Sequence, residues 1–377
     1  MQIGLIGAGA MGRAVAKQMI EVDDQLQISS IFDPDPEAIR ESRRLFGDVF
    51  QDEENLASLM SRDELDWVLI SSWNCFHAEQ VIAALNADKN VFCQKPLATN
   101  LEDCLAMREA WARSGKQFVI GFTLRFSPHY RRIKEIVASG EIGEIISLEF
   151  NETLDFNHGG FIMGDWRRLE ANAGSHLLEK CCHDIDLVNW IVGSRASRVA
   201  SFGGLNFFRP EYEDALERVG RTGSGRQGYM TWRDGGTLNP FKADKDILDN
   251  QVAIIEYANG VRASMHLNSN AAMPERRMYI CGTLGTLRAD VHQGRIEVKE
   301  IGFGKPNSDR STSGQGLHGG GDRVLVQEVI ATMLRGAPIP ASLDEGLDAA
   351  VTCFGIDEAE VTGQVIDMSD YWARVDA

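Results

Sequence analysis

The stretch Gln2-Ile-Gly-Leu-Ile-Gly7-Ala-Gly9-Ala-Met-Gly12 decides the fold of this chain. An apolar run typical of a buried strand ends at Gly7, and an amphipathic run typical of a helix follows the glycines. Glycines in the pattern Gly-x-Gly-x-x-Gly permit a tight turn, a close approach of the backbone to a pyrophosphate, and dense packing of a helix on a strand. The unpaired N–H groups of the helix N-terminus favour phosphate at the same place. The stretch therefore predicts a strand–turn–helix unit that holds a dinucleotide.

The pattern that begins there continues through the first third of the chain. Short apolar runs alternate with amphipathic runs of helical length, as in βαβ units that build a parallel sheet. Nearly continuous apolar runs such as Trp67-Val-Leu-Ile70 indicate strands that are covered on both faces. We predict strands near 2–6, 26–32, 66–71, 90–93 and 117–121, and helices near 11–20, 36–45, 77–87 and 101–114.

A carboxylate ends the second predicted strand. Asp33 follows Gly12 by 21 positions, where it can accept hydrogen bonds from the adenosine ribose and repel the 2′-phosphate of NADP. The alternative is that Asp33-Pro-Asp-Pro36 only caps the next helix. We predict NAD as the cofactor, and NADP remains open because Arg40 and Arg43 on that helix could reach a 2′-phosphate.

A lysine stands at the carboxyl end of the strand near 90–93, in Gln94-Lys95-Pro96. This edge of an open α/β sheet is where ligands bind, and Pro96 stops the chain from continuing in the ladder. Lys95 could stabilise negative charge that develops on a substrate oxygen. The alternative is a solvated lysine at a strand end.

The second part of the chain shows a different pattern. Strand patterns dominate near 144–155, 197–203, 249–258, 261–269, 276–282, 284–290 and 294–300, so we expect an antiparallel or mixed sheet. Helices are expected from Ser127-Pro128 to about 138 and near 174–192, 321–335 and 345–363. The fold class is therefore α/β, with a Rossmann domain over 1–122 and a second α/β domain over 123–377. Residues 209–248 have little periodicity, which is typical of a functional lid or of a disordered excursion.

The helix expected near 174–192 carries an ionisable stripe. At about 100° per residue, Glu179, His183 and Asp186 share one side, flanked by His176 and Trp190. Most of the remaining surface is apolar, so the helix is buried and the stripe must face a cavity, a ligand or its own members. A histidine with a carboxylate one turn away is the usual arrangement of a general base. The alternative is a structural His–carboxylate hydrogen bond.

Composition limits the partners. The 55 acidic and 38 basic side chains give a formal net charge of −17, which repels nucleic acid and anionic membranes. The N-terminal run lacks a basic leader, and no apolar run reaches the roughly 18 residues of a membrane span. The seven cysteines are odd in number and scattered, which favours a reduced, cytoplasmic protein. Cys181 and Cys182 point about 100° apart on a helix, so they argue against a metal site with His183, and we predict none.

A series of motifs, in order and spacing, resembles the Gfo/Idh/MocA family across nearly the whole chain. They are Gly7-Ala-Gly-Ala-Met-Gly12, His77-Ala-Glu-Gln-Val-Ile-Ala-Ala-Leu85, Gln94-Lys-Pro96, Gly121-Phe-Thr-Leu-Arg-Phe-Ser-Pro128, Gly140-Glu-Ile-Gly143 and Glu179-x-x-x-His183-Asp-Ile-Asp186. The resemblance implies a Rossmann domain, then an α/β domain whose large open sheet forms a homodimer or homotetramer. It also implies that the peptide bond between Lys95 and Pro96 is cis.

The resemblance implies catalytic roles for Lys95 and His183, and Glu179 stands where relatives carry an aspartate. The family's glutamate before the lysine is Gln94 here, which leaves the partner of Lys95 open. The expected contacts of the cofactor are Gly7, Gly9, Ala10, Met11, Gly12, Asp33, Ser72, Asn74, His77, Gln94 and Lys95.

Together these features predict hydride transfer between a nicotinamide and a carbinol or ketone of a sugar or polyol. His183 would take the hydroxyl proton, and Lys95 would stabilise the oxyanion. Expected substrate contacts are Arg125, His158, Trp166, Arg167 and Asp186, with Asn157-His-Gly-Gly160 and His318-Gly-Gly-Gly-Asp322 as loops that reach the pocket.

Two other functions occur among the proteins that the chain resembles. One is an NAD-dependent glycosidase that oxidises, eliminates and reduces again without net use of cofactor. The other is a non-catalytic nucleotide-binding regulator, which would not need both Lys95 and His183.

Overall fold

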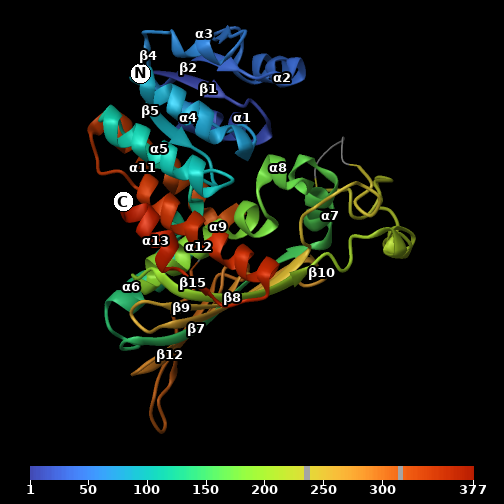
Figure 1. Cartoon of the computed structure of the whole chain (residues 1–377), viewed down its shortest axis with the longest axis vertical. Coiled ribbons are helices and arrows are strands. Elements are labelled where there is room, and N and C mark those ends of the chain that lie inside the picture. Colours follow the sequence, from blue (N-terminus) through green and yellow to red (C-terminus); the bar gives the residue numbers. More distant parts are fainter. Residues whose placement is uncertain (233–237, 313–316) are drawn as a thin grey trace. The chain divides into compact units, whose positions relative to one another are not determined.

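The computed structural model describes residues 1–232, 238–312 and 317–377 (Figure 1). The chain forms two compact units. The first contains Met1–Phe126 and Gly320–Ala350, and the second contains Ser127–Gly319 and Val351–Ala377. The units differ from the predicted division at residue 122 because residues 320–350 return to the first unit.

The first unit is built on six parallel strands in the order β3-β2-β1-β4-β5-β6. This is the strand order of a dinucleotide-binding doubly wound sheet, so the predicted fold of this unit is confirmed. The strands are β1 (Gln2–Ile6), β2 (Gln27–Phe32), β3 (Gln51–Asp52), β4 (Leu65–Ile70), β5 (Asn90–Cys93) and β6 (Phe118–Ile120). The helices are α1 (Ala10–Val22), α2 (Pro36–Phe46), α3 (Leu56–Met60), η1 (Asn74–Phe76), α4 (His77–Asn86), α5 (Leu101–Ser114), η2 (Thr123–Phe126) and α11 (Gly321–Arg335).

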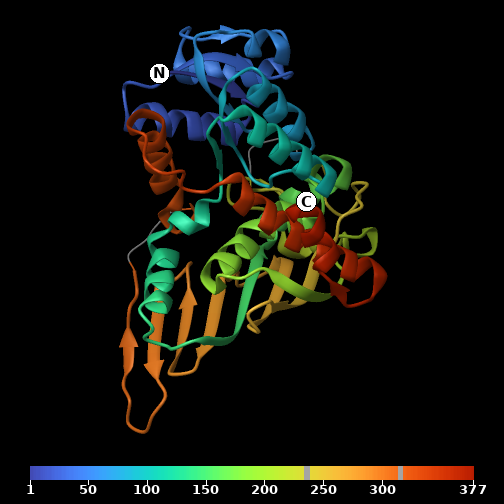
Figure 2. The ribbon, with the colours of Figure 1, turned by 60° about the vertical axis from the view of Figure 1, so that its left-hand side comes forward.

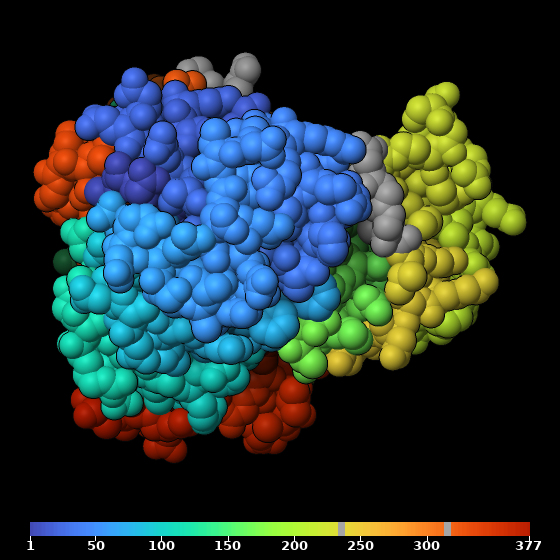
Figure 3. Space-filling model, turned by 90° about the horizontal axis from the view of Figure 1, so that it is seen from above, coloured from blue at the N-terminus to red at the C-terminus, as the bar shows by residue number. Residues whose placement is uncertain are grey.

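The apolar runs explain why these strands are central. Trp67, Val68, Leu69 and Ile70 of β4 are buried, as expected for a strand with helices on both faces. The N-terminal residues form one continuous blue mass in the space-filling view (Figure 3).

The C-terminal part of the first unit is joined to its sheet by specific contacts. The amide of Ile120 at the end of β6 donates to the carbonyl of Ala341 (3.0 Å). Arg125 of η2 forms an ion pair with Glu345, at the beginning of α12 (Leu343–Thr362). Gly346 lies so close that a Cβ there would come within 2.7 Å of Ile120 Cδ1. Residues 341–346 are therefore packed against the sheet edge that carries β6, and α11 contacts α1 and η2.

The second unit is built on nine strands in the order β14-β13-β12-β11-β7-β10-β9-β8-β15. Among the described strands of this sheet, β7 and β10 pair in parallel and every other pair is antiparallel. The predicted mostly antiparallel sheet is therefore confirmed. The strands are β7 (Ile145–Asp155), β8 (Ala196–Gly204), β9 (Asn250–Tyr257), β10 (Arg262–Ala271), β11 (Arg277–Gly282), β12 (Gly285–Asp290), β13 (Arg295–Glu300), β14 (Asn307–Asp309) and β15 (Ile366–Asp367).

Helix α9 (His176–Val192) and the end of α12 lie on one side of the sheet (Figure 2). The helices of this unit are α6 (Pro128–Ala138), α7 (Phe156–Gly164), η3 (Trp166–Arg168), α8 (Glu170–Ala173), α9, η4 (Pro210–Tyr212), α10 (Ala215–Val219), η5 (Leu317–Gly320), the end of α12, and α13 (Ser369–Asp376). Along β9, Ala253 and Ile255 are buried while Val252 and Ile254 are exposed. The sheet therefore has one covered face and one open face that carries apolar side chains.

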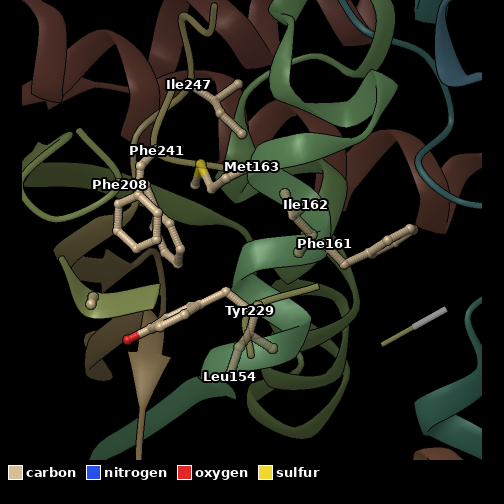
Figure 4. Close-up of a cluster of buried hydrophobic side chains, with 9 residues drawn as sticks. Leu154, Phe161, Ile162, Met163, Phe208, Tyr229, Phe241 and Ile247 are labelled. Atoms are coloured by element: carbon tan, nitrogen blue, oxygen red, sulfur yellow. The ribbon is translucent and has the colours of Figure 1, made fainter. Parts of the chain in front are cut away.

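The segment between β8 and β9, which we call the cap segment (205–249), is ordered over its described residues 205–232 and 238–249. Asp249 accepts hydrogen bonds from the amides of Asn206, Phe207 and Phe208 (2.7–3.0 Å). Aromatic side chains of the cap segment pack with α7 in a hydrophobic cluster (Figure 4). Of the two readings of residues 209–248, a disordered excursion is wrong for the described part.

In the part of the chain that the structure describes, no helix combines the length and the apolar character that crossing a membrane requires.

Candidate active site

The glycine loop between β1 and α1 uses its three glycines in three ways. A Cβ at Gly7, where φ is +81°, would lie 2.3 Å from the amide nitrogen of Ser72, and one at Gly12 would lie 2.1 Å from the carbonyl oxygen of Gly7. At both positions, neighbouring backbone atoms occupy the space that a side chain would need. No described heavy atom lies within 4 Å of a Cβ built at Gly9. The space over Gly9 is therefore available to a pyrophosphate, which fits the dinucleotide role of the loop.

Asp33 lies beside this loop. Its carboxylate accepts hydrogen bonds from the amides of Ala8 (2.7 Å) and Asp35 (2.8 Å), and burial raises its pKa. Asp35, not Asp33, caps helix α2 by accepting from the amide of Glu37. The helix-capping alternative for Asp33 is therefore wrong, and its carboxylate lies where the register of the motif predicts.

Arg40 and Arg43, which could have bound the 2′-phosphate of NADP, form contacts with neighbouring residues instead. Arg40 pairs with Glu37, and Arg43 pairs with Asp48 (3.0 Å) while its guanidinium lies over the ring of Phe50. Recruiting either arginine to a 2′-phosphate would break these contacts.

Lys95 follows β5 at the carboxyl edge of the sheet, and the bond between Lys95 and Pro96 is cis, as predicted. His77 Nδ1 is 2.8 Å from the carbonyl oxygen of Pro96, and its Nε2 is 3.4 Å from the carbonyl oxygen of Ser72. The ring thus ties the turn after β5 to the turn after β4. Burial lowers the pKa of His77, so the ring acts as a neutral tie.

The remaining predicted cofactor residues differ in exposure. Met11 is exposed at the first turn of α1, and Ser72 and Gln94 are partly exposed. His77 is fully buried and supports the turns that carry Ser72 and Lys95, and its predicted contact with the cofactor stays a prediction. Asn74 is also buried, in η1.

Helix α9 begins at a serine cap and carries the predicted stripe. The Ser175 hydroxyl accepts from the amide of Leu178 (3.0 Å). Glu179 forms an ion pair with Arg167 of η3 (Nε to Oε1 2.9 Å), and Arg167 also pairs with Asp165 (2.6 Å). The guanidinium of Arg167 lies 4.3 Å from the centre of the Trp166 ring. The structure therefore brings together three predicted site residues, Trp166, Arg167 and Glu179.

His158 belongs to the same group, but not as predicted. Residues 157–160 were expected to form a loop, whereas they lie within helix α7. The ring of His158 stacks on Trp232 of the cap segment, with centroids 4.0 Å apart and planes 8° apart. Burial lowers the pKa of His158, and Glu179 and Arg167 are among the charges that act on it.

His183 is buried one turn after Glu179, and its ring faces that of His318 with centroids 5.4 Å apart. His318 lies in η5, so this part of the predicted loop 318–322 reaches the stripe of α9. Asp186 is buried on α9 as well.

Arg125 joins two segments of the first unit. Its side chain is buried, and its guanidinium pairs with Glu345, which also accepts a hydrogen bond from the amide of Ser342 (2.6 Å). Arg125 is thus an anchor between η2 and the beginning of α12, and its predicted contact with the substrate stays a prediction.

A buried charge network beside the stripe was missed from the sequence. Arg276 donates two hydrogen bonds to Asp184 (both 2.8 Å) and forms an ion pair with Glu152 of β7 (2.6 Å). Lys180 pairs with the other oxygen of Glu152 (3.5 Å). The signal was present, because Lys180 and Asp184 lie four residues apart on α9, but their partners are distant in sequence. The network fixes the side of α9 that faces β7.

A second missed group holds the beginning of α9. The hydroxyl of Ser175 donates to Asp357 of α12 (2.5 Å), and Gln251 Nε2 lies 3.4 Å from the same carboxyl group. Loss of hydration raises the pKa of Asp357 to about 7, against these hydrogen bonds.

Within the described residues, no group of three or more His, Cys, Asp or Glu side chains is arranged to hold a metal ion. Cys181 and Cys182 are both buried in the core of the second unit.

Two family models match the chain in the order of its two sheets. The model described as "Oxidoreductase family, NAD-binding Rossmann fold" matches residues 1–122, and the "GFO/IDH/MocA C-terminal domain" matches residues 130–288. The chain belongs to the Gfo/Idh/MocA family. The protein is therefore an oxidoreductase of this family with a Rossmann unit for NAD, as the motifs predicted.

Individual relatives support this assignment. Inositol 2-dehydrogenase 3 of Saccharopolyspora erythraea is 38% identical over 144 residues, which are 38% of this chain and 42% of the relative. 2,7-anhydro-N-acetylneuraminate hydratase of Escherichia coli is 25% identical over 292 residues, which are 77% and 68% of the two chains. The solved structure of levoglucosan dehydrogenase with NADH and levoglucosan has a TM-score of 0.80 at 21% identity and covers 98% of this chain and 99% of its own. That last likeness concerns the fold.

Proposed function

We propose that this family member is an NAD-dependent dehydrogenase of a sugar or polyol, in which Lys95 and His183 act on one carbinol. Support comes from relatives named as dehydrogenases of inositol and of levoglucosan. The observation that carries the proposal is the group on α7, η3 and α9. There the Arg167–Glu179 ion pair, the Trp166 ring and the stacked His158 lie beside the turn that carries His183. Charged and aromatic groups together suit a polyhydroxylated ligand better than an apolar one.

NAD bound over the glycine loop would supply the acceptor for the hydride. The imidazole of His183 accepts the proton of the reacting hydroxyl, because a neutral histidine with a carboxylate one turn away is a suitable base at neutral pH. The ammonium of Lys95 donates a hydrogen bond to the oxygen on which negative charge develops. Glu179 and Asp186 orient the base and a neighbouring hydroxyl, and Asp33 binds the adenosine ribose.

Arg167 has a defined place in this proposal. Because it already pairs with Glu179 and Asp165, it fixes the Glu179 carboxylate rather than binding an anionic substrate on its own. The proposed substrates are therefore neutral polyols or sugars, held by hydrogen bonds.

A panel of sugars, polyols and glycosides incubated with NAD tests the proposal. Accumulation of NADH with at least one neutral sugar or polyol is the expected result. No NADH with any compound, together with release of an aglycone or addition of water, would replace the dehydrogenase with the second candidate below.

The second candidate is a reaction that uses NAD without net consumption, as in the glycosidase alternative. The relative named as a hydratase favours including it, because hydration leaves the oxidation state of the substrate unchanged. A regulator without catalysis is disfavoured, because it would not need both Lys95 and His183.

We also propose that the protein is a cytoplasmic homodimer or homotetramer that associates through the open face of the nine-stranded sheet. Phe202, Val252 and Ile254 on β8 and β9 are exposed there. Exposed apolar side chains gathered on one sheet face are typical of an association surface. The odd number of scattered cysteines supports the cytoplasm.

A further inference from the structure

A second histidine faces the proposed base. The rings of His183 and His318 have centroids 5.4 Å apart and planes inclined by 46°. Both residues belong to the second unit. At this separation the ring edges are within reach of a direct hydrogen bond or of one bridging water.

The backbone presents His318 in a conformation that suits glycine better. His318 has φ +52° and ψ +30°, in the left-handed region, and Gly319 and Gly320 continue there with φ +59° and +84°. A histidine pays a steric cost in this region that glycine does not. Such outliers concentrate at functional sites, where the surrounding structure holds them.

The surrounding contacts hold this turn in place. Ser127 Oγ donates to the carbonyl oxygen of Gly319 (3.0 Å), and a Cβ at Gly319 would lie 2.6 Å from Ser127 Oγ and from Val291 Cγ2. The turn is thus fixed on one side by the cap of α6 and on another by the residue after β12. Its position relative to His183 follows from this packing.

The two rings differ in access to water. His183 is buried, whereas His318 is partly exposed. A buried base that takes a proton in each oxidation must return that proton to solvent before the next turnover. Glu179 and Asp186 on α9 are themselves buried, so they do not offer the proton a route to water.

We propose that His318 is the relay residue that carries the proton from His183 to solvent; this rests on the proposed function of His183. In the oxidation, bound NAD⁺ would accept the hydride from the carbinol C–H bond, and the O–H bond would give its proton to the neutral His183 ring. The His183 imidazolium then passes one proton to the neutral His318 ring, directly or through one water. His318 releases it to bulk water, and both rings are neutral again. In the reverse reaction the same route supplies the proton.

The variant His318→Asn tests the relay while keeping the turn. Asparagine tolerates the left-handed region better than other non-glycine residues, so the backbone is retained and the imidazole is lost. His292→Asn, at an exposed histidine in the same unit, is the matched control. Proton release is followed in a single turnover with a pH indicator in weakly buffered solution.

The expected result is that His318→Asn slows proton release and kcat by about tenfold or more, with little change in KM, and that added imidazole restores the rate. His292→Asn leaves both unchanged. An increase in KM with unaltered kcat, or a loss that imidazole does not restore, would overturn the relay.

An NMR measurement without cofactor or substrate tests the contact between His183 and His318 independently of the proposed dehydrogenase activity. With ¹³C-labelled histidine, the ring signal of His183 should shift in His318→Asn and stay in place in His292→Asn. An unshifted signal would show that the two rings do not face each other in solution and would overturn the relay. If the unmodified enzyme turned over no sugar or polyol, the proposed function would fail, and the relay that rests on it would fail as well, whatever the ring signals show.

Discussion

Among single residues, Asp33 is the one that we propose decides between NAD and NADP. Its carboxylate lies against the glycine loop, while Arg40 and Arg43 are paired elsewhere. Asp33→Asn keeps an oxygen that can accept from Ala8 but removes the charge that repels a 2′-phosphate. We expect the ratio of kcat/KM for NAD to that for NADP to fall by about tenfold, as for the loss of one charge interaction.

The matched control is Asp35→Ser, which keeps the cap of α2 and removes a nearby charge. An unchanged ratio in Asp33→Asn, or an equal fall in Asp35→Ser, would contradict the ribose role of Asp33.

We propose that Lys95 stabilises the negative charge that develops on the substrate oxygen. Lys95→Met keeps a similar length and removes the ammonium, so turnover should fall by about 10²-fold or more while NAD binding, measured by calorimetry, changes little. Lys116→Met is the control, because Lys116 pairs with Asp88 at an exposed turn. Retention of most of the activity in Lys95→Met would remove the lysine from the mechanism.

Residues whose role follows from local spacing were predictable from the sequence. Gly7, Gly12 and Asp33 lie where the strand–loop–helix pattern requires them. The intramolecular contacts of Arg125 and His77 were not predictable. The partner of Arg125, Glu345, is 220 positions away, and His77 is tied to carbonyl groups of two separate turns. A side chain's partner across such distances has no signal in one sequence.

At the scale of elements, the glycine loop offers a test that separates fold from ligand. Gly12→Ala forces a Cβ against the carbonyl of Gly7 and should lower the melting temperature, because packing of α1 on β1 must give way. Gly9→Ala meets no described atom and should leave the melting temperature within about 1 °C of the unmodified protein while weakening NAD binding by about tenfold or more.

Gly223→Ala, at another open glycine, should change neither property. NAD affinity that survives Gly9→Ala would contradict the placement of the pyrophosphate over Gly9.

Helix α9 is coupled to pH through Asp357. Because the folded pKa of about 7 lies above the ordinary value of 3.8, the stabilising contribution is present below about pH 4 and is lost as the pH rises to about 7. The side chain of Asp357→Asn stays neutral at every pH. The melting temperature of the variant minus that of the unmodified protein should therefore be larger at pH 8 than at pH 5. Each pKa unit of the shift corresponds to about 1.4 kcal/mol. An equal difference at both pH values would contradict the assignment.

The periodicity of the sequence predicted the long helices and strands but missed helix α7, which carries residues of the candidate site. Strands β1, β2, β4 and β9 and helix α9 lie close to their predicted ranges. Helix α7 was missed because Gly159 and Gly160 are typical of a loop. In the structure they admit the carbonyl oxygens of Ser269 and Tyr229, which a Cβ at either position would meet within about 2 Å. Tertiary packing, not local propensity, placed these glycines in a helix.

At the scale of the whole molecule, the open sheet face predicts association. Ile254→Lys or Phe202→Glu places a charge among exposed apolar side chains and should convert the proposed oligomer to monomers, as measured by light scattering after size-exclusion chromatography. Val361→Lys, at an exposed position on α12, should leave the mass unchanged. An unaltered mass in both sheet variants would place the interface elsewhere.

The division into units shows what sequence could not supply. Residues 320–350 follow the nine-stranded sheet in the chain yet pack on the first unit, through contacts such as that of Ala341 with Ile120. Helical periodicity predicted α11 and α12 but carries no information on which sheet a helix joins. The two sheet types were predictable because strand spacing and turn residues are local.

A crystal structure with NADH and a bound neutral polyol would show whether Lys95 and His183 act on one carbinol. We expect the pyrophosphate over Gly9, and the Lys95 amine and the His183 imidazole both within about 3 Å of one hydroxyl oxygen next to the nicotinamide. A bound polyol that contacts only one of these two groups, or a dinucleotide that avoids the glycine loop, would contradict this expectation.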